Sequence, residues 1–203
     1  MSRTDTNRSG YGFRVRLVVG FVAACLTISS GCGPAVSNQP TPHRESSSPT
    51  THPATTTPSK IDSFQGEYRF LSNFWPAEVE FEGLTYPTVE HAYQSAKTLD
   101  MTERRRIAAL ATPAEAKHAG EALQPQRADW ADVKFDVMER CVRFKFTHHP
   151  ELAEKLLATG DVELIEGNTW GDRIWGVYQG QGDNRLGKIL MKVRDELKST
   201  ARQ

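Results

Sequence analysis

The sequence YPTVEHAYQSAKTLD, residues 86–100, holds the pattern around which the remaining chain is organised. Pro87 and Thr88 can begin a helix, with Thr88 as its N-cap. An acid, an aromatic ring, an amide and an amine then recur at the spacing of one helix face: Glu90, Tyr93, Gln94 and Lys97. Small apolar residues form another face, which we expect to pack into a core: Val89, Ala92 and Ala96. The mixed polar face either meets solvent or lines a site, and spacing alone leaves both interpretations open.

The patterns around this stretch predict a single compact α+β domain over residues 61–203, predominantly helical. Val79 and Phe81 alternate with glutamates up to Gly83, which predicts a short β-hairpin with one buried face. Helical spacing and stop signals predict further helices after the one that begins at Thr88, and an apolar run predicts a strand. The expected helices cover residues 86–100, 102–111, 112–123, 130–147, 150–159 and a final segment after 184, and the expected strand covers 162–165.

Capping residues support these boundaries. Thr112 and Glu115 form a capping-box pattern with a proline between them, and Asp129 and Asn184 are the expected N-caps of the two longest helices. Cys141 lies in the apolar stripe of the 130–147 helix, so we interpret it as a small core residue and not as a nucleophile.

Composition narrows the class of function. The 203 residues carry 25 basic and 25 acidic side chains, but residues 61–203 hold 19 basic and 23 acidic ones. This mildly acidic part has no general attraction for a nucleic-acid backbone, although a single nucleotide remains a possible ligand. Of the three cysteines only Cys141 lies outside the N-terminal segment, which excludes a disulfide framework and a cysteine-rich zinc site there.

The N-terminal segment resembles a bacterial lipoprotein signal. Arginines precede an apolar run at 17–28, which is shorter than the roughly 20 residues of a spanning helix, and small residues lead to Cys32. Ser29 departs from the leucine that this motif prefers. We therefore expect residues 1–32 to be a signal peptide or membrane anchor, with Cys32 lipidated or the run retained, and the domain to be extracytoplasmic. The alternative is an overlong start on a cytoplasmic protein.

Residues 33–60 are rich in proline, serine and threonine and have almost no large apolar side chain. Such a segment cannot bury enough surface to offset the entropy of ordering, so we expect a disordered linker.

A glycine-rich loop over residues 166–187 contains two tryptophans, Trp170 and Trp175, on either side of Asp172. Each tryptophan alone could be core, but flat aromatic faces beside single polar groups suit a planar heterocycle and its sugar. The glycines match neither the dinucleotide fingerprint nor the P-loop. The adjacent pair His148 and His149 diverge on a helix, so we expect no metal site and no cofactor.

Five quoted elements together resemble the NADAR family of YbiA-like domains, from about Phe64 to Leu197. They are FLSNFWP at 70–76, YPTVEHAYQSAK at 86–97, the helix over 129–146, ELIEGNTWGDRIWGV at 163–177 and NRLGKILMKVRDEL at 184–197. The resemblance implies a mostly helical α+β fold and an N-glycosidase. Family substrates are ribosylamino-pyrimidine intermediates of riboflavin synthesis or ADP-ribosylated guanine, cleaved between a nitrogen and ribose C1.

The resemblance also implies roles for residues. Lys97 would be the amine that attacks C1 through a Schiff base, and Glu90 would shuttle protons. Substrate contacts would come from Ser72, Asn73, Phe74, Trp75, His91, Tyr93, Gln94, Asn168, Trp170, Gly171, Asp172, Trp175 and Gly176. Near a helix N-terminus Glu90 should favour its carboxylate, while Lys97 would need a lowered pKa in a dry pocket. About 10 Å of helical rise separates the two, so the substrate would lie between them.

Two other functions are consistent with the sequence. One is a catalytically inactive lipoprotein domain that binds ADP-ribose or another nucleotide, and the other is a structural envelope protein. No protein partner is evident. NADAR domains are usually cytosolic, so export would make a riboflavin intermediate an unlikely substrate.

Overall fold

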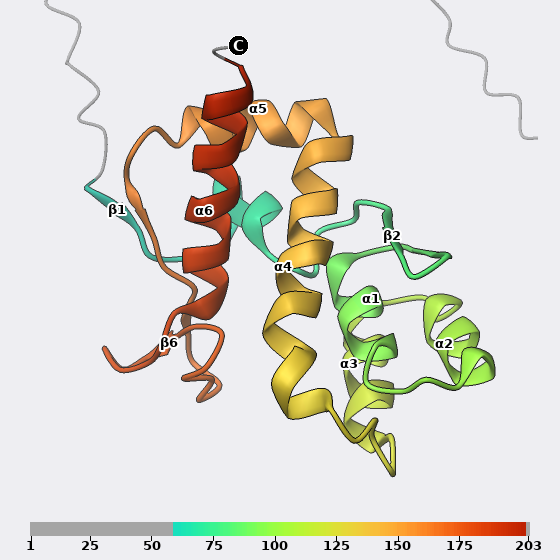
Figure 1. Cartoon of the computed structure of the whole chain (residues 1–203). Coiled ribbons are helices and arrows are strands. Elements are labelled where there is room, and N and C mark those ends of the chain that lie inside the picture. The colour runs from blue at the N-terminus through green and yellow to red at the C-terminus, as the bar shows by residue number, and fades with distance from the viewer. Residues whose placement is uncertain (1–58, 202–203) are drawn as a thin grey trace, which may run out of the picture. The chain divides into compact units, whose positions relative to one another are not determined.

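The computed structural model describes residues 59–201, and Figure 1 shows their arrangement. The expected signal segment 1–32 and nearly all of the expected linker 33–60 lie outside the described residues. Six α-helices are described: α1 (Val89–Ser95), α2 (Met101–Ala108), α3 (Pro113–Ala122), α4 (Trp130–His148), α5 (Pro150–Ala158) and α6 (Arg185–Thr200). A 3-10 helix, η1 (Gly66–Leu71), precedes them. The predicted α+β class with predominant helix is confirmed.

The strands form three two-stranded sheets in the described part of the chain. They are β1 (Lys60–Ile61), β2 (Val79–Phe81), β3 (Leu84–Tyr86), β4 (Glu163–Leu164), β5 (Gly167–Asn168) and β6 (Val177–Tyr178). The antiparallel pair β2 and β3 is the predicted hairpin, with Val79 opposite Tyr86 and both wholly buried. The pairs β1–β4 and β5–β6 are parallel and tie distant segments together.

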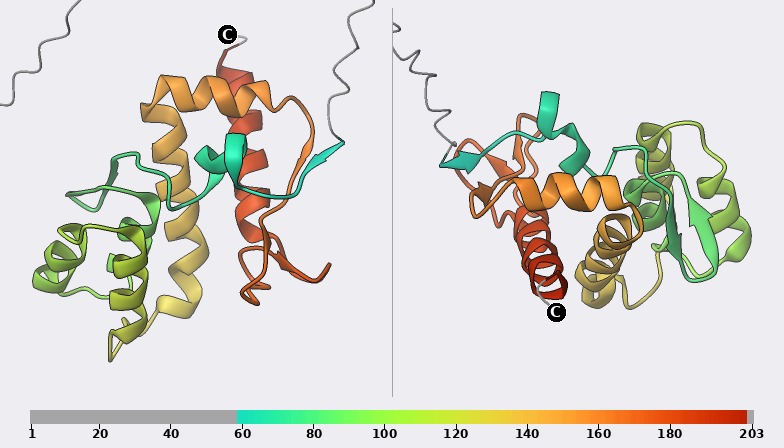
Figure 2. Two further views of the ribbon diagram at one scale, coloured as in Figure 1. Left: turned by 180° about the vertical axis from the view of Figure 1, so that it is seen from behind. Right: turned by 90° about the horizontal axis from the view of Figure 1, so that it is seen from above.

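Helices α4 and α6 lie side by side at the centre, as the views in Figures 1 and 2 agree. Helix α5 crosses one end of this pair, and the group α1–α3 packs on the other side of α4 from α6. The core is formed mainly by apolar side chains of η1, the hairpin and helices α1, α4, α5 and α6. Cys141 is wholly buried there, and burial raises the pKa of its thiol to about 12, as expected for a core residue. Among residues 59–201, no helix has both the length and the apolar character that a membrane crossing requires.

Helix α1 begins as predicted but ends early. The Thr88 hydroxyl caps it by accepting the His91 N–H. The predicted continuation to residue 100 is wrong, because α1 stops at Ser95, whose hydroxyl donates to the Ala92 carbonyl. The N–H groups of Lys97 and Thr98 bond carbonyls three residues back, and the Lys97 carbonyl accepts a 2.8 Å bond from the Arg127 N–H. The last turn therefore tightens and turns toward α2.

The predicted helix caps differ in outcome. The capping box of Thr112 and Glu115 at α3 is formed as predicted, whereas Asp129 and Asn184 occupy the expected N-cap positions without making a capping hydrogen bond. Asp129 precedes α4 without a capping bond, since its carboxylate receives the Arg127 guanidinium at 2.6 Å. Asn184 precedes α6 in a left-handed conformation, and its side chain instead bonds the Leu164 carbonyl and the Glu166 N–H.

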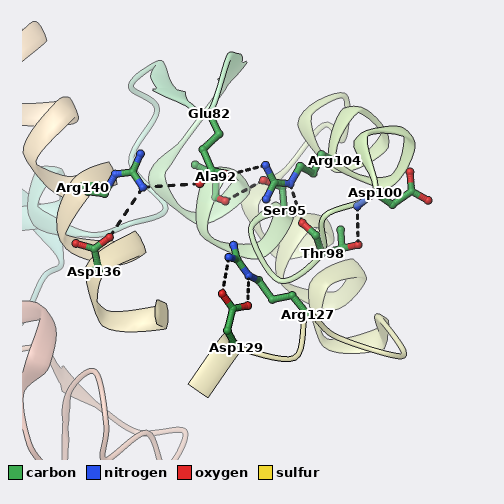
Figure 3. A network of polar contacts seen from close by, with 10 residues as sticks. All are labelled: Glu82, Ala92, Ser95, Thr98, Asp100, Arg104, Arg127, Asp129, Asp136 and Arg140. Carbon is green, nitrogen blue, oxygen red and sulfur yellow. Dashed lines mark hydrogen bonds and ion pairs between the residues drawn. The ribbon is translucent and has the colours of Figure 1, made fainter. Parts of the chain in front are cut away.

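A buried arginine fixes the α1–α3 group to the hairpin. Arg104 on α2 donates to Glu82 at 2.6 Å and to the Thr98 carbonyl at 2.7 Å. Figure 3 shows Glu82 between Arg104 and Arg140, the latter 3.7 Å away on α4. The hairpin tip thus joins α2 to α4 and holds α1 between them.

Candidate active site

One cavity of about 710 Å³ opens beside the polar face of α1. Four groups of residues line it, in chain order: Arg69, Ser72, Asn73 and Phe74 from η1 and the segment after it; Glu90, Tyr93, Gln94 and Lys97 from α1 and the turn after it; Ala114, Lys117, His118 and Glu121 from α3; and Met138 from α4 with Glu166, Trp170, Gly171, Asp172 and Trp175 from the segment between β4 and β6. The FLSNFWP segment, the α1 stretch and the tryptophan loop, distant in sequence, therefore share one site. The solvated interpretation of the α1 polar face is wrong, because Glu90, Gln94 and Lys97 are only 6%, 4% and 8% exposed.

Glu90 is held by its neighbour one turn later. Gln94 Nε2 donates to Glu90 Oε1 at 2.7 Å. Burial raises the pKa of the Glu90 carboxyl, whereas the Gln94 bond and the charges of Lys117 and Lys97 lower it. The expectation of a stabilised carboxylate at the helix N-terminus is wrong in its net direction, because desolvation outweighs these favourable interactions. A carboxyl with a raised pKa can both accept and return a proton during a reaction.

Lys97 presents a buried amine to the same cavity. Its Nζ lies 5.9 Å from the Tyr93 ring centroid and makes no hydrogen bond or ion pair within residues 59–201. Burial lowers the pKa of this amine, opposed by the charges of Glu90 and Glu121. The direction of this pKa shift is the one that a nucleophilic role of Lys97 needs. Glu90 and Lys97 are not joined by an ion pair in the described chain, so the space between them is open to a ligand.

Aromatic rings wall the cavity. Tyr93 packs against Trp175 edge to face at 5.3 Å and against Trp130 at 5.1 Å, and Trp175 also meets Phe135 at 5.5 Å. These contacts fix the inner wall. Trp170 differs, because it is 58% exposed at the cavity edge. Its indole is free to stack on a flat ligand.

The loop that carries the tryptophans is held by its own polar groups. Asn168 donates to the Asp172 carbonyl at 2.7 Å and accepts the Asp172 N–H at 3.0 Å. The Asp172 carboxylate accepts the N–H groups of Ile174 and Trp175 at 2.8 and 2.9 Å. Gly176 lies against the Glu166 carbonyl, where a Cβ would approach to 2.2 Å. Asn168 and Gly176 therefore support the loop but do not line the cavity.

The Ser72–Phe74 wall is held by a buried lysine. Lys145 Nζ donates to the carbonyls of Phe70 and Ser72 at 2.6 and 3.0 Å. Asn73 accepts the Glu90 N–H through its backbone carbonyl at 3.2 Å, which ties this segment to α1. Trp75, expected at the site, is half-buried against the core and does not line the cavity.

The structure does not bring His91 to the cavity. The imidazole is wholly buried, with Nε2 donating to the Leu110 carbonyl at 3.2 Å and Nδ1 2.8 Å from the Thr88 hydroxyl. Burial lowers the pKa of this ring. His91 therefore anchors α1 to the segment before α3.

Sequence reasoning missed one wall and one acid. Ala114, Lys117, His118 and Glu121 recur at helical spacing on α3, so their common face was readable, but nothing in it indicated a ligand. Glu166 follows directly after the predicted strand, and its position in the quoted ELIEG element was the only signal. Burial raises the pKa of Glu166 to about 8, with the charges of Asp172 and Glu90 adding to the effect.

Metal ligation has no support among residues 59–201, where no three His, Cys, Asp or Glu side chains cluster. His148 stacks on Phe144, and His149 is 2.8 Å from the Glu78 carbonyl.

The fold and the cavity define a class: a small α+β domain in which a carboxyl from α1 and an amine from the turn after it line a ligand-sized cavity together with aromatic rings. Residues 61–198 match the NADAR domain model, and the chain belongs to the NADAR family. Its architecture is similar to the solved structure of E. coli YbiA, with a TM-score of 0.64 and 36% identity over 71% of this chain and 86% of that one.

Curated relatives extend the comparison. N-glycosidase YbiA of E. coli strain K12 is 40% identical over 139 residues, 66% of this chain and 85% of that protein. N-glycosidase Npun_R5314 of Nostoc punctiforme is 39% identical over 137 residues, covering 65% and 87%. Riboflavin biosynthesis protein VVA0006 of Vibrio vulnificus is 41% identical over 134 residues, 65% of this chain, but the match spans only 36% of that longer protein.

Proposed function

We propose that this domain hydrolyses the N-glycosidic bond between a nitrogen and ribose C1 of a nucleotide-type substrate. Two relatives are named N-glycosidases, and this chain belongs to the same family, which supports a hydrolase that acts on N-glycosyl bonds. The observation that carries the residue assignment is that the unbonded Lys97 amine and the Glu90 carboxyl line one buried cavity without pairing. Lys97 is the nucleophile and Glu90 the proton carrier.

The cavity suits covalent catalysis by an amine. A lysine attacks carbon only when neutral, and desolvation that lowers the pKa of Lys97 increases the neutral fraction at physiological pH. Attack on C1 releases the base and leaves ribose on Lys97, whose open-chain form is a Schiff base. Water then cleaves the C1–nitrogen bond to Lys97 and regenerates the amine. Glu90, close enough to Lys97 to influence its pKa, accepts and returns the lysine proton.

Two substrates fit this proposal: ADP-ribosylated guanine and a ribosylamino-pyrimidine intermediate of riboflavin synthesis. Both present a flat base that can stack on Trp170, and both present ribose to Lys97 and Glu90. The name of the Vibrio relative favours the pyrimidine. If the N-terminal segment exports the domain, a riboflavin intermediate becomes an unlikely substrate, because these intermediates are formed inside the cell, and an extracellular nucleotide derivative is favoured instead.

The test is base release by the full chain. Each substrate is incubated with wild type, Lys97→Ala and Glu90→Gln, and free base is measured by chromatography. Borohydride should trap ribose on Lys97 in the wild type and not in Lys97→Ala. The exposed Lys188→Ala and Glu154→Gln serve as matched controls and should retain activity. Release that survives both cavity variants would refute the mechanism, and saturable binding of ADP-ribose without product would leave a binding domain instead.

A further inference from the structure

The cavity contains a second buried carboxyl, Glu166, in a rigid position between β4 and β5. Its N–H donates to Asn184 at 3.1 Å, and its carbonyl accepts the Val177 N–H at 2.8 Å and packs on Gly176. The backbone is therefore fixed on both sides of the residue. The side chain lines the cavity, and its Oε2 is buried without a hydrogen-bond partner among residues 59–201. An unsatisfied polar atom in a ligand cavity is costly unless a ligand or a function uses it.

Glu90 and Glu166, two of the carboxyls that line the cavity, differ in the groups that surround them. Burial raises the pKa of the Glu90 carboxyl, but Glu90 also accepts the Gln94 amide and is near two cations, Lys117 and Lys97, and these three contacts favour its anion. Glu166 accepts no side-chain hydrogen bond in the described structure. Its neighbours Asp172 and Glu90 disfavour its anion, and only Lys117 opposes them.

When two carboxyls in one site have such different surroundings, the surroundings decide which one acts as the acid and which one as the base. The contacts assign the proton to Glu166, because its Oε2 has no donor among residues 59–201 while Glu90 Oε1 accepts the Gln94 amide, a bond that favours a carboxylate. Burial also raises the pKa of Glu166 to about 8. An N-glycosidase of this kind needs one protonated carboxyl and one carboxylate, because the departing nitrogen must gain a proton while the attacking amine loses one.

We propose that Glu166 is the acid that protonates the departing base nitrogen, with Glu90 as the base for Lys97. This assignment rests on the proposed function. In the first step Lys97 Nζ bonds to C1 and passes a proton to Glu90. The bond between C1 and the base breaks, its electron pair stays on the base nitrogen, and the Glu166 proton goes to that nitrogen.

The second step restores both groups. Water adds its oxygen to C1 and gives a proton to the Glu166 carboxylate, the C1–Nζ bond breaks, and Lys97 takes back its proton from Glu90. One water is consumed, and ribose with a C1 hydroxyl and a protonated base are released.

A purely structural Glu166 and an acid catalyst predict different pH behaviour. If Glu166 donates the proton, kcat of the wild type falls above pH about 8 as the group ionises, and this basic limb disappears in Glu166→Gln. The glutamine keeps the size of the side chain but cannot transfer a proton, so kcat should drop about 100- to 10,000-fold. Glu166→Asp keeps a carboxyl and should regain part of the rate.

The experiment measures base release by the full chain from pH 6 to 10 for wild type, Glu166→Gln and Glu166→Asp. Glu163→Gln, an exposed glutamate three residues earlier, is the matched control and should resemble wild type. Thermal unfolding confirms that each variant folds. Infrared spectroscopy provides a readout independent of turnover: a protonated-carboxyl band at pH 7 should be present in wild type and should lose the intensity of one carboxyl in Glu166→Gln.

The outcomes separate the two proposals. If wild type releases base and is trapped by borohydride, but Glu166→Gln retains its rate and its basic limb, the role of Glu166 is overturned and the proposed function stands. Absence of the infrared band in active wild type overturns the same role. If wild type neither releases base nor forms the adduct, the proposed function fails, and the role of Glu166 with it.

Discussion

Gln94 Nε2 donates a 2.7 Å hydrogen bond to Glu90 Oε1, one turn earlier on α1. The bond orients the Glu90 carboxyl, and the Lys97 amine has no direct ion partner in the part of the chain that the structure describes. An amine locked in an ion pair would stay charged and could not attack. Glu90 is therefore bonded to Gln94 and not to Lys97, and the Lys97 amine retains access to a substrate.

Gln94→Ala should reduce the fraction of Glu90 that is ionised at neutral pH and leave the Lys97 side chain in place. Loss of a bond that favours the carboxylate raises the pKa of Glu90, so the acidic limb of the rate profile moves to higher pH. We expect kcat at pH 7 to fall about tenfold, in line with the value of one bond to a charged group. Gly120→Ala should act similarly, since its Cβ would approach Gln94 Oε1 to 2.1 Å. The pH profile of base release tests this. Gln181→Ala, at an exposed position, is the control, and an acidic limb at the same pH in Gln94→Ala as in this control would contradict the prediction.

Trp170→Ala should weaken substrate binding and leave the fold intact. The indole is 58% exposed beside the cavity, so truncation removes little packing. Stacking of one base on an aromatic ring contributes about 1–3 kcal/mol, and KM should rise at least about fivefold with little change in kcat. The melting temperature should stay near that of wild type. In contrast, Trp175→Ala should lower it, because Trp175 packs on Tyr93 and Phe135. An unchanged KM would remove Trp170 from the binding site.

Local patterns predicted the parts of the fold that depend on neighbours in sequence. The Val79 and Phe81 alternation and the Thr112 box are examples, because burial face and cap follow from residues a few positions apart. The early end of α1 was not predictable in this way. It depends on the Lys97 carbonyl meeting the Arg127 N–H, a contact made by the fold.

The site shows the same division. Glu90 and Gln94 share a face at four-residue spacing, whereas His91, one residue after Glu90, is rotated by about 100° and points to Leu110. Glu166 could not be chosen from the sequence alone. Its protonation depends on burial and on Asp172 and Glu90, which the fold brings near.

The N-terminal segment gives a prediction that lies outside residues 59–201. If Cys32 is the lipidated residue, Cys32→Ser should abolish incorporation of labelled lipid and release the protein from the membrane fraction. Cys25→Ser, within the apolar run, is the matched control and should keep both properties. Unchanged fractionation of Cys32→Ser would favour an uncleaved anchor or a cytoplasmic protein.

Lys145 links pH to the stability of the cavity wall. Its amine is wholly buried and donates to the Phe70 and Ser72 carbonyls, and burial lowers its pKa to about 7. The unfolded chain keeps the ordinary lysine pKa, so between the two values it binds more protons than the folded chain. The cost of burying the charge is therefore fully present below pH 7 and decreases as pH rises toward the unfolded value.

Lys145→Met removes this titration together with the two bonds to the wall. The free energy of unfolding of wild type, relative to the variant, should increase from pH 7 to pH 9, with a slope of at most about 1.4 kcal/mol per pH unit for one proton. Urea unfolding at several pH values measures it. Lys188→Met, at an exposed position of α6, is the control and should show a difference independent of pH. A flat difference for Lys145→Met would mean that the buried amine keeps its charge up to pH 9, and its two carbonyl bonds would then stabilise the ammonium enough to offset desolvation.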